Sequence, residues 1–430
     1  MASKNCLCKL RKLIVFSLLK ISMAVLGRVA RMTLRELLLF ILIMFMFIVI
    51  WTWNDEKRES SANPVIVWWT NGFPGTQGTK LCPDNLKCEV FCDKSIRNGD
   101  AYLFYGSNIN IEDLPLPRRA NKVLWGLYHE ESPRNLEELM HEEMLNIFNF
   151  SSTYSRFSDV PFPLQHLNSA NEITNTEYFV ETADKNRFLK DISAIMYLQS
   201  DCETSTERDQ YVKELMKLIK VDSYGLCLKN KEMPLKFTED YLNNLDNEEF
   251  LKFVARYKFV IAIENGICND YVTEKFWRAI KIGTVPIYFG SPSVRDWFPN
   301  EQSAILIKDY PTPKALYNHV RMLLENDTLY ETYLEHKTKQ IITNQKLVEE
   351  LRSRPYQLNA LETVEKFECF VCKKLHEKYR KISIVDKKHY DCPKPISALS
   401  LSVNPRNDWV YSWQAAKDRV KKIYKNFTEE

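Results

Sequence analysis

The stretch "KFVIAIENGICNDYVTEKFWRAIKIGTVPIYFG" (residues 258–290) decides the fold class. Its first seven residues read as a buried strand that ends in an acid, Glu264. The segment "TEKFWRAIKIG" (273–283) begins with Thr and ends with Gly, the expected punctuation of a helix. The apolar segment "VPIYFGS" (285–291) reads as the next strand. This order of elements indicates a parallel sheet with a crossover helix.

The same alternation extends outward from this stretch. Further strands are predicted at "AIMYLQSD" (194–201), "VDSYG" (221–225) and "AILIKDY" (304–310), and helices at "ERDQYVKELMKLI" (207–219), "FLKFVARY" (250–257) and "PKALYNHVRMLLEND" (313–327). Nearer the N-terminus, "PVIVWWT" (64–70), "AYLFYGS" (101–107) and "KVLWGLYHEESP" (122–133) read as strands, with a Gly-containing loop and three cysteines after the first. We therefore expect an α/β protein whose parallel sheets are covered by helices on both faces.

A polar cluster lies where the central strand gives way to the next helix. Ligands of parallel α/β sheets bind beyond the carboxyl ends of the strands, against helix N-termini. Asn265, Tyr271, Thr273, Glu274 and Lys275 have that location, where free N–H groups and the helix dipole favour an anion. We interpret the cluster as a site for a phosphate-bearing ligand. The alternative, a structural turn with a Thr-Glu cap, does not explain Asn265, Tyr271 and Lys275.

The composition limits the class of protein. The chain has 430 residues, 45% of them hydrophobic and 12% aromatic, which is enough for a large core and two or three domains. Lys and Arg number 59 and Asp and Glu 56, so the net charge is only +3. Such a balance argues against a nucleic-acid binder.

The first 53 residues differ from the remainder. The segment "LLLFILIMFMFIVIWTW" (37–53) carries a long apolar run, and eight Lys or Arg precede it, which places the N-terminus in the cytosol. We predict a cytosolic basic tail (1–36), a single-pass type II transmembrane anchor (37–53) and a short stem (54–63). The remaining chain would then lie in the lumen of the endoplasmic reticulum or the Golgi. A cleaved signal peptide is the alternative, but no small-x-small cleavage site follows the run.

Cysteines and sequons agree with a lumenal location. Nine of the 11 cysteines follow residue 54, and most of them are expected in disulfides in an oxidising compartment. The pair in "CFVC", Cys369 and Cys372, also fits half of a zinc site, although the chain lacks a second Cys-x-x-Cys. The sequons at Asn149, Asn326 and Asn426 are candidate N-glycosylation sites.

Several segments resemble one known family. The stretch "ENGICNDYVTEKFWRAIKIGTVPIYFGSPSVRDW" (264–297) is similar to the donor-binding signature of the α-1,3-fucosyltransferases, glycosyltransferase family 10. The resemblance extends to "HEESP" (129–133), "IFNFSSTYSRFSD" (147–159), the pair Ser200 and Arg208, and "CFVC" (369–372), and covers roughly residues 64–372. The segments "VDSYGLC", "GSPSVRDW" and "FECFVC" are most similar to the endoplasmic-reticulum branch, which resembles protein O-fucosyltransferases.

The resemblance implies a GT-B fold, in which two Rossmann-like domains face each other across a cleft. It places an acceptor-side domain at 64–192, a donor domain at 193–345, and a C-terminal return segment and tail at 346–430. It also implies disulfides between the cluster Cys82, Cys88 and Cys92 and the pair Cys369 and Cys372. We can place no counterpart of the tail 373–430 in the family. The family is largely metal-independent, which agrees with the lack of Asp-x-Asp in this chain, so no metal cofactor is expected.

The resemblance also assigns roles to single residues. Arg208 and Lys275 would bind the diphosphate of GDP-fucose, for which a forked guanidinium and a compact ammonium are suited; from spacing alone Arg208 reads as a solvated helix charge. Glu131 corresponds to the general base, with Glu130 as the alternative. The base needs a raised pKa to act near neutral pH; burial by the acceptor would raise it, and an ordinary pKa is compatible with the free enzyme. Four more polar residues would line the ribose and fucose or contact the donor: Ser200, Asn265, Tyr271 and Glu274. Of these, Glu274 is also counted among the catalytic residues.

The implied activity is inverting transfer of L-fucose from GDP-fucose, in α linkage, to lumenal glycoproteins. The expected acceptors are Ser or Thr of EMI domains, and α-1,3-fucosylation of GlcNAc in N-glycans is the first alternative. A catalytically silent lumenal binder or folding helper is the second, although it would have no chemical reason to retain Glu131, Arg208, Glu274 and Lys275 together. A GT-B transferase of another nucleotide sugar is the third.

Overall fold

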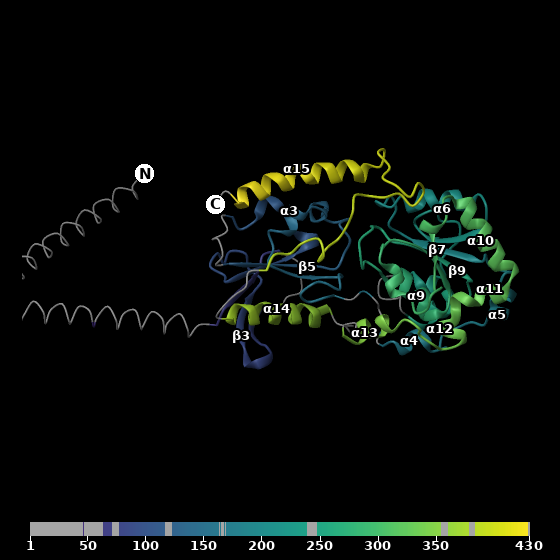
Figure 1. Ribbon diagram of the computed structural model, residues 1–430, viewed down its shortest axis with the longest axis horizontal. Helices are drawn as coiled ribbons and strands as arrows, with labels where there is room; N and C mark the ends of the chain where they lie inside the picture. The colour runs from purple at the N-terminus through teal and green to yellow at the C-terminus, as the bar shows by residue number, and fades with distance from the viewer. Residues whose placement is uncertain are drawn as a thin grey trace, which may run out of the picture. The chain divides into compact units, whose positions relative to one another are not determined.

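Two mainly parallel β-sheets organise the chain in the computed structural model (Figure 1). The structure describes Met46 and residues 63–70, 77–116, 123–162, 164, 167, 169–238, 247–353, 360–377 and 383–428. Met1–Asn63 and Pro64–Glu430 are separate units. The predicted tail, anchor and stem lie outside the described residues, apart from Met46 and Asn63. Within the described part of the chain, no helix combines the length and apolar character needed to span a bilayer.

The second sheet confirms the strand–helix alternation. Its five strands pair in parallel in the order β11-β10-β9-β7-β8. Their bounds are β7 (Ile195–Gln199), β8 (Val221–Gly225), β9 (Phe259–Ile263), β10 (Val285–Phe289) and β11 (Ile305–Leu306). The strand predicted at 304–310 is shorter than expected, because a 3₁₀ helix follows β11 at the sheet edge. The strand order reverses between β7 and β9, where the crevice of a doubly wound sheet forms.

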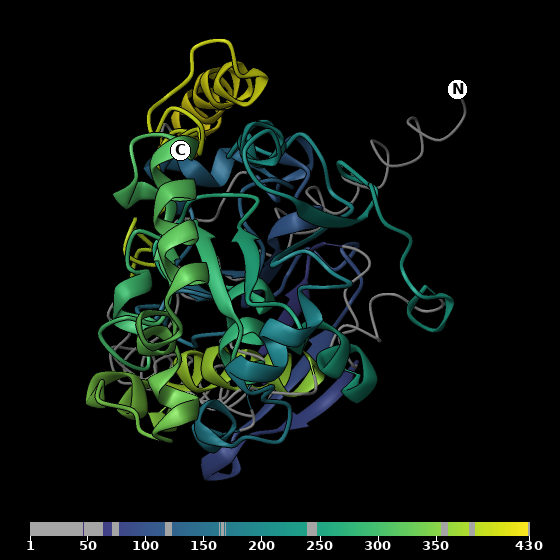
Figure 2. The ribbon, with the colours of Figure 1, turned by 90° about the vertical axis from the view of Figure 1, so that its right-hand side faces the viewer.

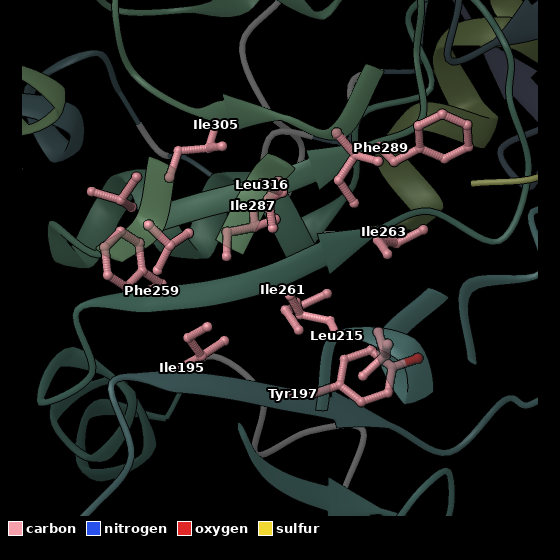
Figure 3. Close-up of a cluster of buried hydrophobic side chains, with 14 of the residues drawn as sticks. Ile195, Tyr197, Leu215, Phe259, Ile261, Ile263, Ile287, Phe289, Ile305 and Leu316 are labelled. Carbon is pink, nitrogen blue, oxygen red and sulfur yellow. The ribbon is translucent and has the colours of Figure 1, made fainter. Parts of the chain in front are cut away.

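Helices cover both faces of this sheet. On one face, α6 (Arg208–Met216) and α10 (Pro313–Glu325) pack against alternate strand residues such as Ile261 and Ile287 (Figure 3). On the other face, α8 (Glu248–Ala255) and α9 (Glu274–Ile282) cover the intervening residues, including Ala262. Burial on both faces explains why β7, β9 and β10 read as nearly continuous apolar runs.

The ends of α9 follow the sequence signals. The Thr273 hydroxyl accepts a hydrogen bond from the Lys275 N–H at the N-terminus. Gly283 ends the helix with φ 68°, a left-handed conformation that suits glycine. A Cβ there would also lie 2.4 Å from the ring of Phe179, so the position has no room for a side chain.

The first sheet has six strands in the order β2-β3-β1-β4-β5-β6, and only β2 and β3 pair antiparallel. Their bounds are β1 (Val65–Trp68), β2 (Gly78–Leu81), β3 (Lys87–Phe91), β4 (Ala101–Tyr105), β5 (Leu124–His129) and β6 (Phe150–Thr153). The β2–β3 hairpin corrects the sequence-based prediction, which placed a loop with cysteines in this segment. Only Cys88 and Val90 are buried among its nine strand residues, so the hairpin lacks the apolar pattern of a core strand.

C-terminal helices cover both faces of the first sheet (Figures 1 and 2). Phe367 and Val371 of α14 (Ala360–His376) pack on one face, with Trp68 and Tyr128. On the other face, Val420 of α15 (Asp408–Thr428) joins the cluster that contains side chains of α3 (Glu142–Leu145). The core of the first sheet is thus completed by the end of the chain.

The remaining helices are short. The α-helices are α4 (Asn171–Thr174), α5 (Thr182–Phe188), α11 (Asp327–Glu331), α12 (Glu335–Thr338) and α13 (Gln345–Ser353). The 3₁₀ helices lie at Pro83–Asn85, Gly106–Asn108, Ile111–Asp113, Glu137–Met140, Leu235–Phe237, Val294–Trp297, Ile307–Asp309 and Thr332–Leu334.

Four disulfides join distant segments of the described chain. Cys82–Cys369 and Cys88–Cys372 tie the β2–β3 hairpin to α14, as the family resemblance implied. Two further disulfides are Cys202–Cys227 and Cys268–Cys392. Cys92 belongs to none of the four, which corrects its inclusion among the disulfide candidates. Because Cys369 and Cys372 are oxidised, they cannot supply thiolates, and the zinc alternative does not apply.

The three sequons differ in accessibility. Asn149 is buried; its side-chain oxygen accepts from the Trp125 N–H at 2.9 Å, and its amide nitrogen donates to the Ser383 carbonyl at 3.0 Å. A glycan at Asn149 therefore does not fit the folded chain, and that expectation is corrected. Asn326 and Asn426 are exposed.

Candidate functional site

A cleft of about 640 Å³ gathers the predicted site residues. It lies at the carboxyl ends of β5, β7 and β9 and at the starts of α6 and α9. Residues that follow strands of the first sheet and residues that follow strands of the second sheet therefore both contribute to it. Its lining includes all seven residues assigned to catalysis or donor binding: Glu131, Ser200, Arg208, Asn265, Tyr271, Glu274 and Lys275. Four more charged residues also line it: Glu130, Arg134, Asp201 and Arg278.

Glu131 follows β5, and three donors hold one of its carboxylate oxygens. Oε1 accepts from the Ser132 N–H at 2.7 Å, from the Asn265 side-chain amide at 3.2 Å, and from the Tyr271 hydroxyl. Burial by itself would raise the pKa of Glu131, but these hydrogen bonds, with the nearby Lys275 charge, hold the pKa below its usual value. No residue in the described ranges donates to Oε2. The cleft thus holds an ionised carboxylate whose hydrogen bonds from the described residues all go to Oε1.

The pKa of Glu131 is thus lower than the ordinary value expected of the free enzyme, and lower than the raised value that a general base needs near neutral pH. The neighbouring acid shows the opposite behaviour, because burial raises the pKa of Glu130, although Tyr105 donates to its Oε1 at 2.7 Å. Two adjacent carboxyl groups therefore have environments that shift their pKa values in opposite directions. Such a split is typical of sites in which neighbouring acids have different roles.

Arg208 is the first residue of α6 and is 1% exposed. Its Nη1 donates to the Ile263 carbonyl at 3.2 Å, and its Nη2 donates to the Asp201 carbonyl and lies 3.5 Å from the Asp201 carboxylate. Its Nε is buried and has no hydrogen-bond partner within the described part of the chain. The guanidinium is therefore fixed in place at the wall of the cleft, and the reading as a solvated helix charge is wrong.

Lys275 lies in the first turn of α9. Its Nζ donates to Glu274 Oε1 at 3.0 Å and to the Thr273 hydroxyl at 3.1 Å, and lies 3.6 Å from Glu264 Oε2. Burial would lower the pKa of Lys275, but Glu274 and Glu264 together raise it. The ammonium is consequently charged, beside helix N–H groups that favour an anion.

Glu264, the acid at the end of β9, holds the start of α9. It is fully buried, and its two oxygens accept from the Thr273 N–H and from the Thr273 hydroxyl, each at 2.8 Å. Burial raises the pKa of Glu264, and the Lys275 charge opposes that effect. Glu264 therefore positions the helix start that carries Glu274 and Lys275 and does not itself line the cleft.

Asp270 joins the loop before α9 to the loop after β6. Its carboxylate accepts from Arg156, whose Nε lies 2.9 Å and Nη2 2.5 Å away, and from the Ser293 hydroxyl at 2.9 Å. Burial would raise the pKa of Asp270, but Arg156 and the other donors lower it. The pair of Arg156 and Asp270 thus connects segments that follow strands of the two sheets.

Sequence reasoning missed a charged link between two residues that line the cleft. Arg134, three residues after Glu131, lies 2.5 Å from Asp201, which directly follows Ser200 and also pairs with Arg208. One carboxylate thus pairs with two guanidinium groups. Proximity in sequence to Glu131 and Ser200 was the only available signal, because nothing local predicts that Arg134 and Asp201 meet.

Comparisons with known proteins identify relatives of the chain. Two family models match, "Glycosyltransferase family 10 (fucosyltransferase) C-term" over residues 189–389 and "Fucosyltransferase, N-terminal" over residues 47–165. The chain is 39% identical to "Alpha-(1,3)-fucosyltransferase B" of Drosophila melanogaster, over 85% of this chain and 84% of the relative. It is 36% identical to "GDP-fucose protein O-fucosyltransferase 3" of Homo sapiens, over 86% and 81% respectively. A structure titled "Crystal Structure of alpha1,3-Fucosyltransferase with GDP" is similar at 15% identity, with a TM-score of 0.41, covering 74% of this chain and 93% of that one.

Proposed function

The chain belongs to glycosyltransferase family 10, the fucosyltransferases, and we propose that it transfers fucose from GDP-fucose to an acceptor hydroxyl with inversion at the sugar. The observation that carries this proposal is the composition of the cleft. Two fixed cations, Arg208 and Lys275, line the same cleft as the ionised carboxylate of Glu131. A diphosphate and a hydroxyl nucleophile need these two kinds of group.

In the proposed reaction, the acceptor hydroxyl lies against Oε2 of Glu131. Its oxygen forms a bond to the anomeric carbon of fucose as its proton passes to Glu131. The bond from that carbon to the β-phosphate oxygen breaks, and its electron pair leaves with GDP. Arg208 and Lys275 stabilise the charge that develops on the diphosphate, so the leaving group needs no general acid. Ser200, Asn265, Tyr271 and Glu274 would contact the donor, in a GT-B arrangement of the two halves.

The acceptor is proposed to be a protein hydroxyl, a Ser or Thr of an EMI domain. The similarity to proteins named "GDP-fucose protein O-fucosyltransferase 3" supports a protein acceptor. The choice of an EMI domain follows the resemblance of the sequence to the endoplasmic-reticulum branch. The second candidate is α-1,3-fucosylation of GlcNAc in N-glycans, which the name of the Drosophila relative favours. Four disulfides support an oxidising compartment, and we propose a type II anchored enzyme of the endoplasmic reticulum or Golgi membrane.

The test uses the full chain with labelled GDP-fucose. Acceptors are a folded EMI domain, the same domain after enzymatic removal of N-glycans, and free N-glycans. A protein acceptor predicts label on the EMI domain whether or not glycans are present, and label on N-glycans alone would favour the second candidate. No transfer to any acceptor, and no hydrolysis of the donor, would support the silent binder. Transfer that persists in chelator agrees with the proposed metal-independent mechanism, and strict loss in chelator would refute it.

A further inference from the structure

The C-terminal strap, defined here as residues 383–398, packs against the loops that surround Glu131. Near its start, the Val385 N–H donates to the Phe148 carbonyl at 3.0 Å. Further along, the Ser155 hydroxyl donates to the Lys388 carbonyl at 2.6 Å. Near its end, the Ala398 N–H donates to the Thr206 carbonyl at 2.8 Å, two residues before Arg208. The strap thus contacts segments next to strands of both sheets. The sequence predicted no role for the strap.

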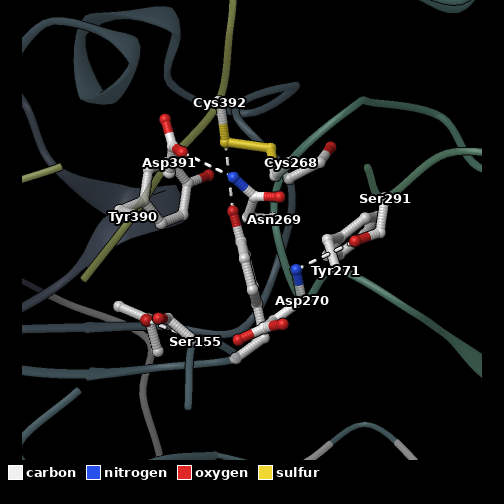
Figure 4. The surroundings of a disulfide bond; sticks show 12 residues. Ser155, Cys268, Asn269, Asp270, Tyr271, Ser291, Tyr390, Asp391 and Cys392 are labelled. Atoms are coloured by element: carbon white, nitrogen blue, oxygen red, sulfur yellow. Dashed lines mark hydrogen bonds between the residues drawn. A yellow bond between two sulfur atoms is a disulfide. The ribbon is translucent and has the colours of Figure 1, made fainter. Parts of the chain in front are cut away.

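A disulfide fixes the strap to the loop between β9 and α9. Cys392 is bonded to Cys268, and the adjacent residues add a second connection (Figure 4). The Asn269 N–H donates to the Asp391 carbonyl at 2.9 Å, and the Asn269 side chain donates to the Asp391 carboxylate at 2.6 Å. The strap and the loop are therefore held together here by one disulfide and two hydrogen bonds.

Tyr390, two residues before Cys392, connects the strap to Glu131. It is fully buried, and its hydroxyl donates to the Glu131 carbonyl at 2.9 Å. Its ring packs against His129, with centroids 5.5 Å apart, and against Tyr154 at 5.2 Å. Tyr154 in turn packs edge-on against Tyr271, at 5.0 Å. The backbone of Glu131 is thereby held from the strap through a continuous aromatic cluster.

The opposite end of Glu131 is held from the loop that carries Cys268. Asn265 and Tyr271, each three residues from Cys268, donate to the Glu131 carboxylate. The disulfide therefore connects the element that binds the Glu131 backbone to the element that binds its carboxylate. A glutamate side chain is flexible, and a displacement of about 1 Å can lower a catalytic rate by about two orders of magnitude.

We infer that the C-terminal strap is a positioning element for the general base. Tyr390 fixes the backbone of Glu131, and the Cys268–Cys392 disulfide keeps Tyr390 in register with Asn265 and Tyr271. This inference rests on the proposed role of Glu131. Tyr390 acts through Glu131 and is not among the residues that line the cleft, so its loss should change turnover and leave donor binding intact.

The test compares Tyr390→Phe with Tyr330→Phe in the full chain. Tyr330 is a matched control, because it is also fully buried and its hydroxyl also donates to a backbone carbonyl, that of Lys258, at 2.9 Å. We expect kcat of Tyr390→Phe to fall about 10- to 100-fold. Its Kd for GDP, measured by calorimetry, should stay within about twofold of the wild-type value, because Arg208 and Lys275 are unchanged. Tyr330→Phe should keep its kcat while losing a similar amount of thermal stability.

A double replacement, Cys268→Ala with Cys392→Ala, tests the connection separately. If the disulfide and Tyr390 act as one device, adding Tyr390→Phe to this variant lowers kcat by much less than it does in the wild type. Full additivity of the two effects would contradict a shared role. Should the cysteine variant fail to fold, the comparison of the two tyrosines decides the inference.

Glu131→Gln separates this inference from the proposed function. If that variant loses turnover while Tyr390→Phe behaves like Tyr330→Phe, the strap has only a structural role and the inference is overturned. Equal losses of kcat and GDP affinity in Tyr390→Phe would overturn it as well, because they indicate general disruption. If Glu131→Gln retains turnover, the assignment of the base fails, and the inference fails with it.

Discussion

Replacing Tyr271 with Phe tests the charge state of Glu131. Tyr271 is 3% exposed, and its hydroxyl is one of the three donors to Oε1 of the carboxylate. Burial acts to raise the pKa of Glu131, and the donors acting against it keep that pKa low. A hydrogen bond to a charged group is worth about 1.5–3 kcal/mol. Losing it should therefore raise the affinity of Glu131 for a proton about 10- to 100-fold.

The sign of the effect on activity follows from the role of a base. Glu131 must be ionised to accept the acceptor proton, so activity is lost as the pH falls through its pKa. In Tyr271→Phe, the acidic limb of the kcat/KM profile should move to higher pH by about 1–2 pH units. The profile of kcat/KM is the right measurement, because it reports the free enzyme. Glu130, His129 and Lys275 also surround Glu131, but the substitution leaves all three in place.

Transfer of labelled fucose, measured from pH 4 to 9, provides the profile. Tyr330→Phe serves again as the control and should keep the wild-type limb. An unshifted limb in Tyr271→Phe, or a shift to lower pH, would refute the reasoning, because the hydroxyl would then not stabilise the carboxylate in the working enzyme.

Three further predictions concern binding and stability. Lys275→Met should weaken GDP binding about 10- to 100-fold in calorimetry, because a charge-assisted contact is lost. The control Lys281→Met, at the other end of α9, should bind GDP normally. Equal losses of GDP affinity in the two variants would argue against a specific contact. Burial lowers the pKa of His129 from 6.5 to about 4, so the folded state takes up fewer protons than the unfolded state between these values and stability falls as the pH drops from 6.5 towards 4. The shift corresponds to roughly 3 kcal/mol, and His129→Phe should remove that part of the pH dependence in denaturant titrations; an unchanged dependence would contradict it. Arg156→Ala leaves Asp270 buried without its main partner and should lower the free energy of unfolding by about 3–5 kcal/mol. Arg295→Ala breaks the exposed pair with Asp309 and should lower it by at most about 1 kcal/mol. Similar losses in the two variants would show that burial of the first pair does not matter.

The strands and helices of the sheet after residue 194 were predictable, because the sequence signals that specify each of them lie within the element itself. Strands β7, β9 and β10 are buried on both faces and so appear as apolar runs, and α9 carries its own capping residues, Thr273 and Gly283. The hairpin β2–β3 was not predictable in this way. Only two of its nine strand residues are buried, and the disulfides that hold it reach cysteines more than 280 residues away in sequence.

The candidate site was predictable as a set of residues but not as a set of contacts. The family resemblance supplied Glu131, Arg208 and Lys275, and these line one cleft. The sharing of Asp201 between Arg134 and Arg208 depends on how the two halves meet, and no local pattern encodes it. The lowered pKa of Glu131 likewise depends on donors from a segment more than 130 residues away.

The placement of α14 has a consequence for synthesis of the chain. Strands β1, β3, β4 and β5 leave the ribosome long before Phe367 and Val371, the side chains that cover one of their faces. At about 5–20 residues per second, the roughly 280 residues between Cys88 and Cys372 take about 15–60 s to translate. During that interval an apolar surface and reactive thiols stay exposed while the downstream half can already fold. A premature stop before residue 360 would therefore damage the beginning of the molecule more than its middle, and such a nascent chain should be a client of chaperones and disulfide isomerases.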